Sequence, residues 1–110
     1  MGGGKSARTK GHSFERFVAI KLREIYPNAR RQLEYQIDDC NGVDISGTGQ
    51  FKFQCKKLKK YASINAIKEI QCETILGEVP ILVTAGDHET VMAVLPFEEL
   101  LRLLKKWERE

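Results

Sequence analysis

The residue types best suited to chemistry in this sequence are a carboxylate, an amide and a lysine, at Asp44, Gln54 and Lys56. Gln54 and Lys56 lie in residues 51–56 (FKFQCK), where the alternation of apolar and polar side chains predicts a half-buried strand. Because successive side chains of a strand point to opposite faces, Gln54 and Lys56 are expected to share its polar face. Asp44 lies ten residues before Gln54, in the middle of a short apolar segment at residues 43–45.

The segment between these two predicted strands is Ser46-Gly47-Thr48-Gly49-Gln50, and its glycines favour a hairpin turn. Two adjacent strands would bring a carboxylate, an amide oxygen and an ammonium group together. Such a site suits a hard divalent cation beside a positive charge. Two plainer interpretations remain open: Asp44 as a carboxylate that caps a loop, and Lys56 as part of an exposed basic run at residues 56–60.

Length and composition predict one small globular domain, with 110 residues of which 42% are hydrophobic and 30% charged. No apolar run approaches the ~20 residues that a membrane span needs, and the first residues do not predict a secretory signal. Cys40, Cys55 and Cys72 are odd in number and widely spaced, which predicts neither a disulfide framework nor a zinc site. We therefore expect a cytoplasmic protein, in the cytoplasm of the host cell if a phage encodes it.

The net charge of +3 conceals a strong separation of charge along the chain. Residues 1–31 carry eight Lys and Arg against two acidic residues, and residues 51–60 carry five lysines and no acid. Residues 61–110 carry five basic against nine acidic residues. Because the basic segments flank the candidate site, the arrangement favours a polyanionic ligand.

Hydrophobic periodicity and turn residues predict the order α-β-β-β-α-β-β-α, an α/β domain with a mixed sheet flanked by helices. We expect a flexible basic arm at residues 1–11 and a single domain at residues 12–110. Ser13 and Ser63 are the expected N-caps of the first two helices. The expected helices span about 12–26, 63–76 and 96–107, and the expected strands span about 29–36, 43–46, 51–57, 79–84 and 90–95, with a loop at 37–42.

Several short motifs together resemble the PD-(D/E)XK nuclease superfamily, and within it the archaeal-type Holliday junction resolvases, including phage-borne versions. These motifs are Lys10-Gly11-His12-Ser13-Phe14-Glu15-Arg16, Arg30-Arg31, Val43-Asp44-Ile45, Phe53-Gln54-Cys55-Lys56 and Pro80-Ile81-Leu82-Val83. The resemblance covers about residues 10–105. The chain departs from the family at Gln54, where the family usually has Glu or Asp, and at Val43, where it usually has proline.

The resemblance implies a restriction-endonuclease-like fold and phosphodiester hydrolysis that depends on Mg²⁺, with Mn²⁺ as a substitute. It implies a catalytic set of Glu15, Asp44, Gln54 and Lys56. The metal ligands would be Asp44, the Gln54 amide oxygen, the Cys55 backbone carbonyl and Glu15 through a water. Lys56 would orient the attacking water or offset charge on the phosphorane, and Glu15 could alternatively orient Lys56. Glu34, Asp38 and Asp39 remain open as further acids.

The implied substrate is a four-way DNA junction, cut by a homodimer that selects it by shape. The residues expected to contact DNA phosphates are Lys5, Arg8, Lys10, Arg16, Arg30, Arg31, Lys57, Lys59 and Lys60. Apolar side chains available for a dimer interface are Ile64, Ile67, Leu103 and Trp107. Two alternatives remain: another PD-(D/E)XK nuclease acting on duplex DNA, or a DNA-binding module that has lost catalysis.

Overall fold

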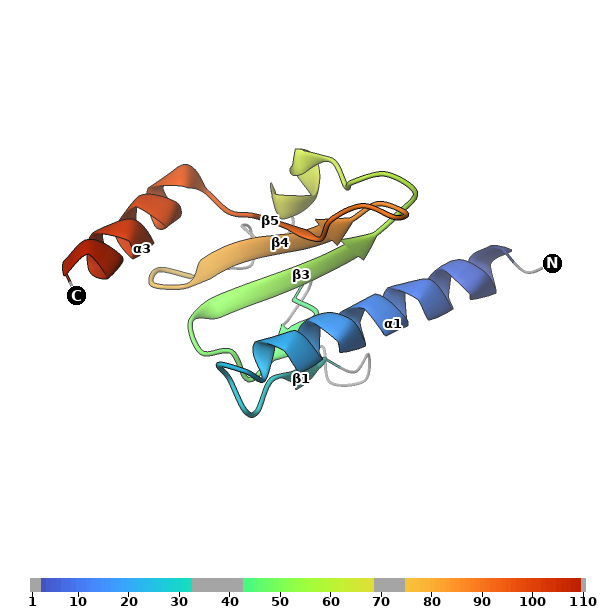
Figure 1. The fold of residues 1–110 in the computed structure, drawn as a ribbon, viewed down its shortest axis with the longest axis horizontal. Helices are drawn as coiled ribbons and strands as arrows, with labels where there is room; N and C mark the ends of the chain where they lie inside the picture. The colour runs from blue at the N-terminus through green and yellow to red at the C-terminus, as the bar shows by residue number, and fades with distance from the viewer. Residues whose placement is uncertain (1–2, 33–42, 69–74, 110) are drawn as a thin grey trace.

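The chain folds as an α/β protein whose five-stranded mixed sheet is flanked by helices (Figure 1). The structure, a computed structural model, describes residues 3–32, 43–68 and 75–109, with side chains of the first helix described from residue 11. The elements are α1 (Gly3–Leu22), β1 (Arg30–Arg31), β2 (Ile45–Ser46), β3 (Phe51–Lys57), the 3₁₀ helix η2 (Ile64–Ala66), β4 (Val79–Ala85), β5 (Met92–Val94) and α3 (Phe97–Arg109).

The strands are arranged in the order β1-β2-β3-β4-β5, so that β3 is the middle strand. β3 and β4 are parallel over seven residue pairs, from Phe51 opposite Val79 to Lys57 opposite Ala85. The other three pairings are antiparallel. A parallel pair needs a crossover connection, and here that connection contains η2.

Both faces of β3 are covered, which corrects the prediction that this strand is half-buried. On one face, Phe14 and Val18 of α1 pack in a core cluster with Phe53 and Cys55 of β3. On the other face, Ile67 packs against Leu82, the register partner of Gln54. Figure 1 shows α1 and the η2 segment on opposite sides of β3. The alternation predicts the two faces of β3, but the layer on the second face comes from a distant segment that the local pattern does not reveal.

The first helix starts at Gly3, so the prediction that it starts near His12 is wrong. Ser13 lies inside α1 and does not cap it. The preceding residues include good helix formers, lysine, alanine and arginine, and Gly11, the glycine in the middle of the helix, costs only about 1 kcal/mol of helix stability. The helix also ends at Leu22, ahead of the predicted stop at Pro27.

Several predicted elements are confirmed, although their lengths differ. The predictions for β3, β4 and α3 agree closely with the structure, and β2 and β5 are shorter than predicted. The described part of the first predicted strand contains β1 at Arg30–Arg31, and residues 33–36 of that prediction lie outside the described residues. Ser63 caps η2 through a bond from the Asn65 N–H to its hydroxyl (3.1 Å), as predicted. Gly77 has the positive φ expected of a turn. The predicted loop at 37–42 and most of the second predicted helix lie outside the described residues.

α3 is amphipathic but buries none of its residues, and the carbonyl of Pro96 accepts its first N–H bonds. Trp107 is 75% exposed and Ile64 is 68% exposed, so both are available for an interface. Ile67 is a core residue, however, and its assignment to a dimer interface is wrong because it packs on Leu82. None of the helices in the described part of the chain has the length and apolar character to cross a membrane.

Candidate metal and DNA-binding site

Asp44 lies immediately before β2 and is held against the middle of β3. Its N–H donates to the Phe53 carbonyl (2.8 Å), and its Oδ2 accepts from the Cys55 N–H (2.7 Å). Because strand N–H groups point sideways toward the neighbouring strand, the carboxylate lies close to the plane of the sheet. Asp44 is thus alongside Gln54, at the point where the regular pairing of β2 with β3 ends.

These bonds give Asp44 a structural role, but not that of a loop cap, because its carboxylate accepts from an N–H inside strand β3. Its Oδ2 replaces a carbonyl that would otherwise accept the Cys55 N–H in a longer strand. A carboxylate has two oxygens and about four acceptor positions, so this bond leaves it able to bind a cation. The structural and the chemical roles of Asp44 are therefore compatible.

Cys55 has two carboxylates in its surroundings. Burial raises the pKa of its thiol far above the ordinary range, and the negative charges of Asp44 and then Glu15 raise it further. The thiol therefore stays protonated at neutral pH, the less reactive form of a cysteine. The same electrostatic effects indicate that Asp44 and Glu15 approach one residue of β3 from different elements.

Glu15 forms an ion pair with Arg31, in which Nε donates to Oε1 over 2.8 Å. Both side chains are largely buried, at 17% and 18% exposure. Arg31 is opposite Ile45, the residue after Asp44, so this pair joins α1 to the strands beside the candidate site. Among the described residues Glu15 has Arg31 as its partner, and the predicted contact of Glu15 with Lys56 has no counterpart there.

Gln54 and Lys56 lie on the face of β3 opposite Cys55, as the alternation predicts. Gln54 is only 1% exposed, and its register partner is the fully buried Leu82. Lys56 is half-buried and lies opposite Thr84, whose hydroxyl accepts from the Ala62 N–H (2.9 Å). The segment around Ala62 therefore covers the face that carries Gln54.

The residues around Asp44 offer hard oxygen donors. Within the described ranges, no three His, Cys, Asp or Glu side chains gather into a metal site. Mg²⁺ needs only one or two carboxylates because it keeps several waters. The Asp44 carboxylate, the Gln54 amide oxygen and the Cys55 carbonyl fit that donor chemistry. Glu34, Asp38 and Asp39, the candidates for a further acid, lie outside the described residues.

The predicted phosphate-binding residues fall into different environments. Lys57 donates to the Gly86 carbonyl (3.0 Å) and lies 3.9 Å from Asp87, so it stabilises the loop after β4. Arg16, Arg30, Lys59 and Lys60 are exposed. Lys5, Arg8 and Lys10 lie on the first turns of α1, and their side chains are outside the description.

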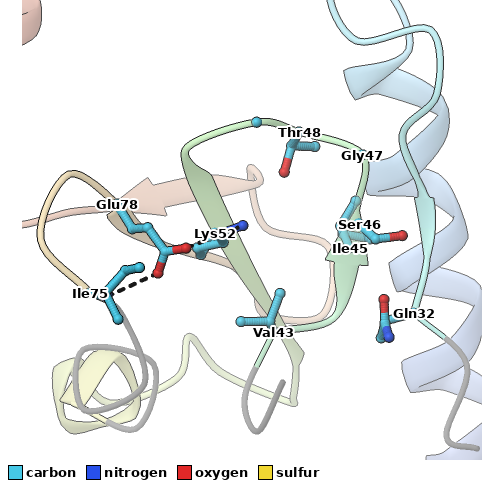
Figure 2. A pocket seen from close by; sticks show the side chains of 10 residues that line it. Gln32, Val43, Ile45, Ser46, Gly47, Thr48, Lys52, Ile75 and Glu78 are labelled. Atoms are coloured by element: carbon cyan, nitrogen blue, oxygen red, sulfur yellow. Dashed lines mark hydrogen bonds and ion pairs between the residues drawn. The ribbon is translucent and has the colours of Figure 1, made fainter. Parts of the chain in front are cut away.

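A pocket of about 300 Å³ is lined by Val43 and Ile45, the residues before and after Asp44 in the sequence (Figure 2). Its wall includes Lys52, which shares a face of β3 with Gln54 and Lys56. The Lys52 ammonium lies 3.5 Å from the Glu78 carboxylate. Figure 2 shows both side chains at this pocket. No local pattern in the sequence predicts this pair, because the parallel register of β3 with β4 brings the two residues together.

Comparisons with known proteins found no match to a family model, to a curated protein or to a solved structure. The fold and the site define the class of this protein only at a coarse level. It is an α/β protein with a mixed sheet, and a carboxylate is fixed at the edge of its middle strand.

Proposed function

We propose that this protein is a homodimeric, metal-dependent endodeoxyribonuclease that resolves four-way DNA junctions by paired nicks. The proposal includes a restriction-endonuclease-like arrangement of the mixed sheet, which the motif resemblance implies. The described elements are compatible with that arrangement: a helix, three strands, a crossover and two further strands follow one another in the expected order.

The observation that carries the proposal is the position of Asp44 against residues 53–55 of β3. Two separate motifs of the sequence meet there, the first supplying Asp44 and the second supplying Gln54 and Lys56. A third motif supplies Glu15, whose charge acts on the same cysteine as that of Asp44. Asp44 thus meets residues 53–55 of the middle strand, whereas α1, which carries Glu15, packs on the face of that strand opposite Gln54 and Lys56.

Each residue has a specific proposed role in the chemistry. A Mg²⁺ ion bound by Asp44, with the Gln54 and Cys55 oxygens, would polarise a phosphoryl oxygen and lower the pKa of a bound water. The Lys56 ammonium stabilises the negative charge that grows on the phosphorane. Glu15 orients the Arg31 guanidinium, which suits a phosphate because its planar fork binds two oxygens at once.

The exposed apolar residues support the proposed dimer. Trp107 on α3 and Ile64 on η2 are mostly exposed, and aromatic residues of this kind are enriched at interfaces. A dimer would hold two sites at a fixed separation, which allows selection of a junction by shape.

A DNA-binding module without catalysis is the second candidate. Gln54 carries no charge, and Asp44 is the only carboxylate among the described residues that bonds to β3 at residues 53–55. This candidate predicts junction binding without cleavage in any divalent cation.

Replacing Lys56 by alanine should slow the chemical step about 10²-fold, since removal of one charge-stabilising group typically has an effect of that size. Single-turnover cleavage of a labelled junction in Mg²⁺ measures the step directly. Lys52→Ala is the matched control, because it removes a lysine from the same face of the same strand. An unchanged rate in Lys56→Ala would remove this lysine from the mechanism.

Replacing Gln54 by glutamate should make stability depend on Mg²⁺. Gln54 is 1% exposed, so a carboxylate at this position should reduce the free energy of unfolding in EDTA by about 2 kcal/mol. This loss corresponds to a fall of about 10 °C in Tm. Mg²⁺ should restore most of that loss, because the new charge would be a metal ligand. Thermal unfolding with and without Mg²⁺ is the measurement, and exposed Gln50→Glu is the control. Equal responses of the two variants to Mg²⁺ would contradict the assignment of Gln54 as a ligand.

A further inference from the structure

A basic pocket lies just after the end of α1, and neither Asp44 nor Glu15 lines it. It is an open pocket of about 480 Å³ lined by Arg23, Pro27, Asn28, Ala29, Arg30, Ser46 and Gly47. None of these residues is acidic. We propose that this pocket, here called the arginine pocket, binds a backbone phosphate of the DNA strand that flanks the cleaved phosphate, an inference that rests on the proposed function.

Arg23 is oriented by the backbone that forms the pocket. Its Nε donates to the Ala29 carbonyl over 2.8 Å, and the Ala29 N–H donates to the Tyr26 carbonyl over 2.9 Å. This bond uses one of the five N–H donors of a guanidinium, so the group is positioned without being neutralised. An arginine held in this way loses little further conformational freedom when it binds phosphate.

The opposite wall is fixed by a close backbone approach. Gly47 lies so near Asn28 that a Cβ built on it would be 2.2 Å from the Asn28 carbonyl oxygen. Arg30 is in register with Ser46, which places the second arginine on the edge strand beside this contact. The walls of the arginine pocket are therefore ordered parts of the fold.

The local charge favours an anion. The end of a helix carries a partial negative charge of about −0.5, which alone would repel a phosphate. Two guanidinium charges exceed it about fourfold. Another pocket shares Arg23 with the arginine pocket and also has no acidic residue in its lining, which consists of Arg16, Ala19, Ile20, Arg23 and Arg31. Arginines therefore continue along α1 and β1 toward the Glu15–Arg31 pair.

The spacing from Asp44 matches a nucleic-acid strand. Ser46 lies two residues after Asp44, which is about 7 Å along a strand. Consecutive phosphates of one DNA strand are displaced around the helix axis as well as by about 3.4 Å along it, so a separation of this size matches the phosphate next to one bound at Asp44. This distance is suited to a flanking phosphate on the same strand.

Arg23 also has a plainer interpretation, since arginines near a helix C-terminus stabilise it through the macrodipole and by bonding to carbonyls. That role affects folding but not the salt dependence of DNA binding. A plot of log K for DNA binding against log salt concentration has a negative slope. Each lost phosphate contact should make this slope less steep by about 1. The slope therefore distinguishes the two roles.

The test is equilibrium binding of a fluorescent four-way junction in EDTA, measured across salt concentrations for the full chain. Arg23→Gln and Arg30→Gln should each make the negative slope less steep by about 1. Arg23→Lys keeps the charge and should retain the wild-type slope within about 0.3. Arg102→Gln on α3 is the matched control and should not change it. If Arg23→Gln fails to fold, Arg30→Gln on the exposed edge strand is sufficient.

Wild-type slopes in both glutamine variants would overturn the arginine pocket while leaving the proposed nuclease intact. Equal reductions in these variants and in Arg102→Gln would also overturn it, because the effect would then reflect net charge alone. Absence of any junction binding by the wild-type protein would overturn both the pocket and the proposed function.

Discussion

Asp44→Asn should lower junction cleavage in Mg²⁺ by about 10³-fold or more, while junction binding stays equal to that of the wild type or becomes tighter. Asparagine removes the charge that holds the metal. Its amide oxygen can still accept from the Cys55 N–H, so the bond that fixes residue 44 to β3 is kept. Cleavage rates and binding isotherms on the same labelled junction separate the two effects.

Asp44→Ala is the matched comparison, since it removes both the charge and the acceptor. It should leave the Cys55 N–H without its carboxylate and reduce the free energy of unfolding by about 1–3 kcal/mol. The free energy of unfolding of Asp44→Asn should remain within about 1 kcal/mol of that of the wild type. If Asp44→Asn still cuts at the wild-type rate, Asp44 does not hold the metal and its role is structural.

Gly47→Ala should reduce the free energy of unfolding by about 4 kcal/mol, from backbone strain and overpacking together. Gly47 has φ of +83°, and an added Cβ would lie 2.2 Å from the Asn28 oxygen and 2.7 Å from the Asn28 carbonyl carbon. Because those contacts are with backbone, a side-chain rearrangement cannot relieve them. Chemical denaturation of the wild type and the variant gives the difference directly.

Gly49→Ala provides the control in the same turn. Gly49 also has a positive φ, of +61°, but an added Cβ meets nothing within 4 Å. Gly49→Ala should reduce the free energy of unfolding by only about 1 kcal/mol, which is the cost of placing alanine in the left-handed backbone region. Equal losses in the two variants would show that the close approach of the hairpin to Asn28 contributes nothing to stability.

The parts of the fold that could be predicted from the sequence are those with a local physical cause. The alternation in residues 51–56 predicts β3, and the glycines at 47 and 49 predict the hairpin. Ser63 caps the segment that it was expected to cap. The continuous apolar run of β4 predicts a strand covered on both faces, and that strand is buried at six of its seven positions.

Features that depend on contacts between distant segments could not be predicted. The burial of Gln54 requires residues 62–67 to cross over β3, and the pairing of Lys52 with Glu78 requires the parallel register. A contact of Glu15 with Lys56 is one of the expectations from the sequence, whereas its partner in the structure is Arg31 on the edge strand β1, which β2 separates from β3. The start of α1 was misplaced because Ser13 has the chemistry of a cap but lies within a longer helix.

The site shows the same division between local and distant causes. The types and spacing of Asp44, Gln54 and Lys56 predict the pairing of the two adjacent strands β2 and β3, which the structure contains. The bond from the Cys55 N–H to the Asp44 carboxylate depends on where regular pairing of β2 stops, and no sequence pattern specifies that point. The arginine pocket likewise depends on the approach of Gly47 to Asn28.

The most direct test of the nuclease proposal is cleavage of a labelled synthetic four-way junction, beside a linear duplex of the same sequence, in Mg²⁺ and in EDTA. We expect symmetric nicks in opposing strands of the junction in Mg²⁺, none in EDTA and none in the linear duplex. Junction binding without cleavage in either Mg²⁺ or Mn²⁺ would contradict the proposed activity and favour a DNA-binding module, and cleavage of both substrates would contradict the selectivity.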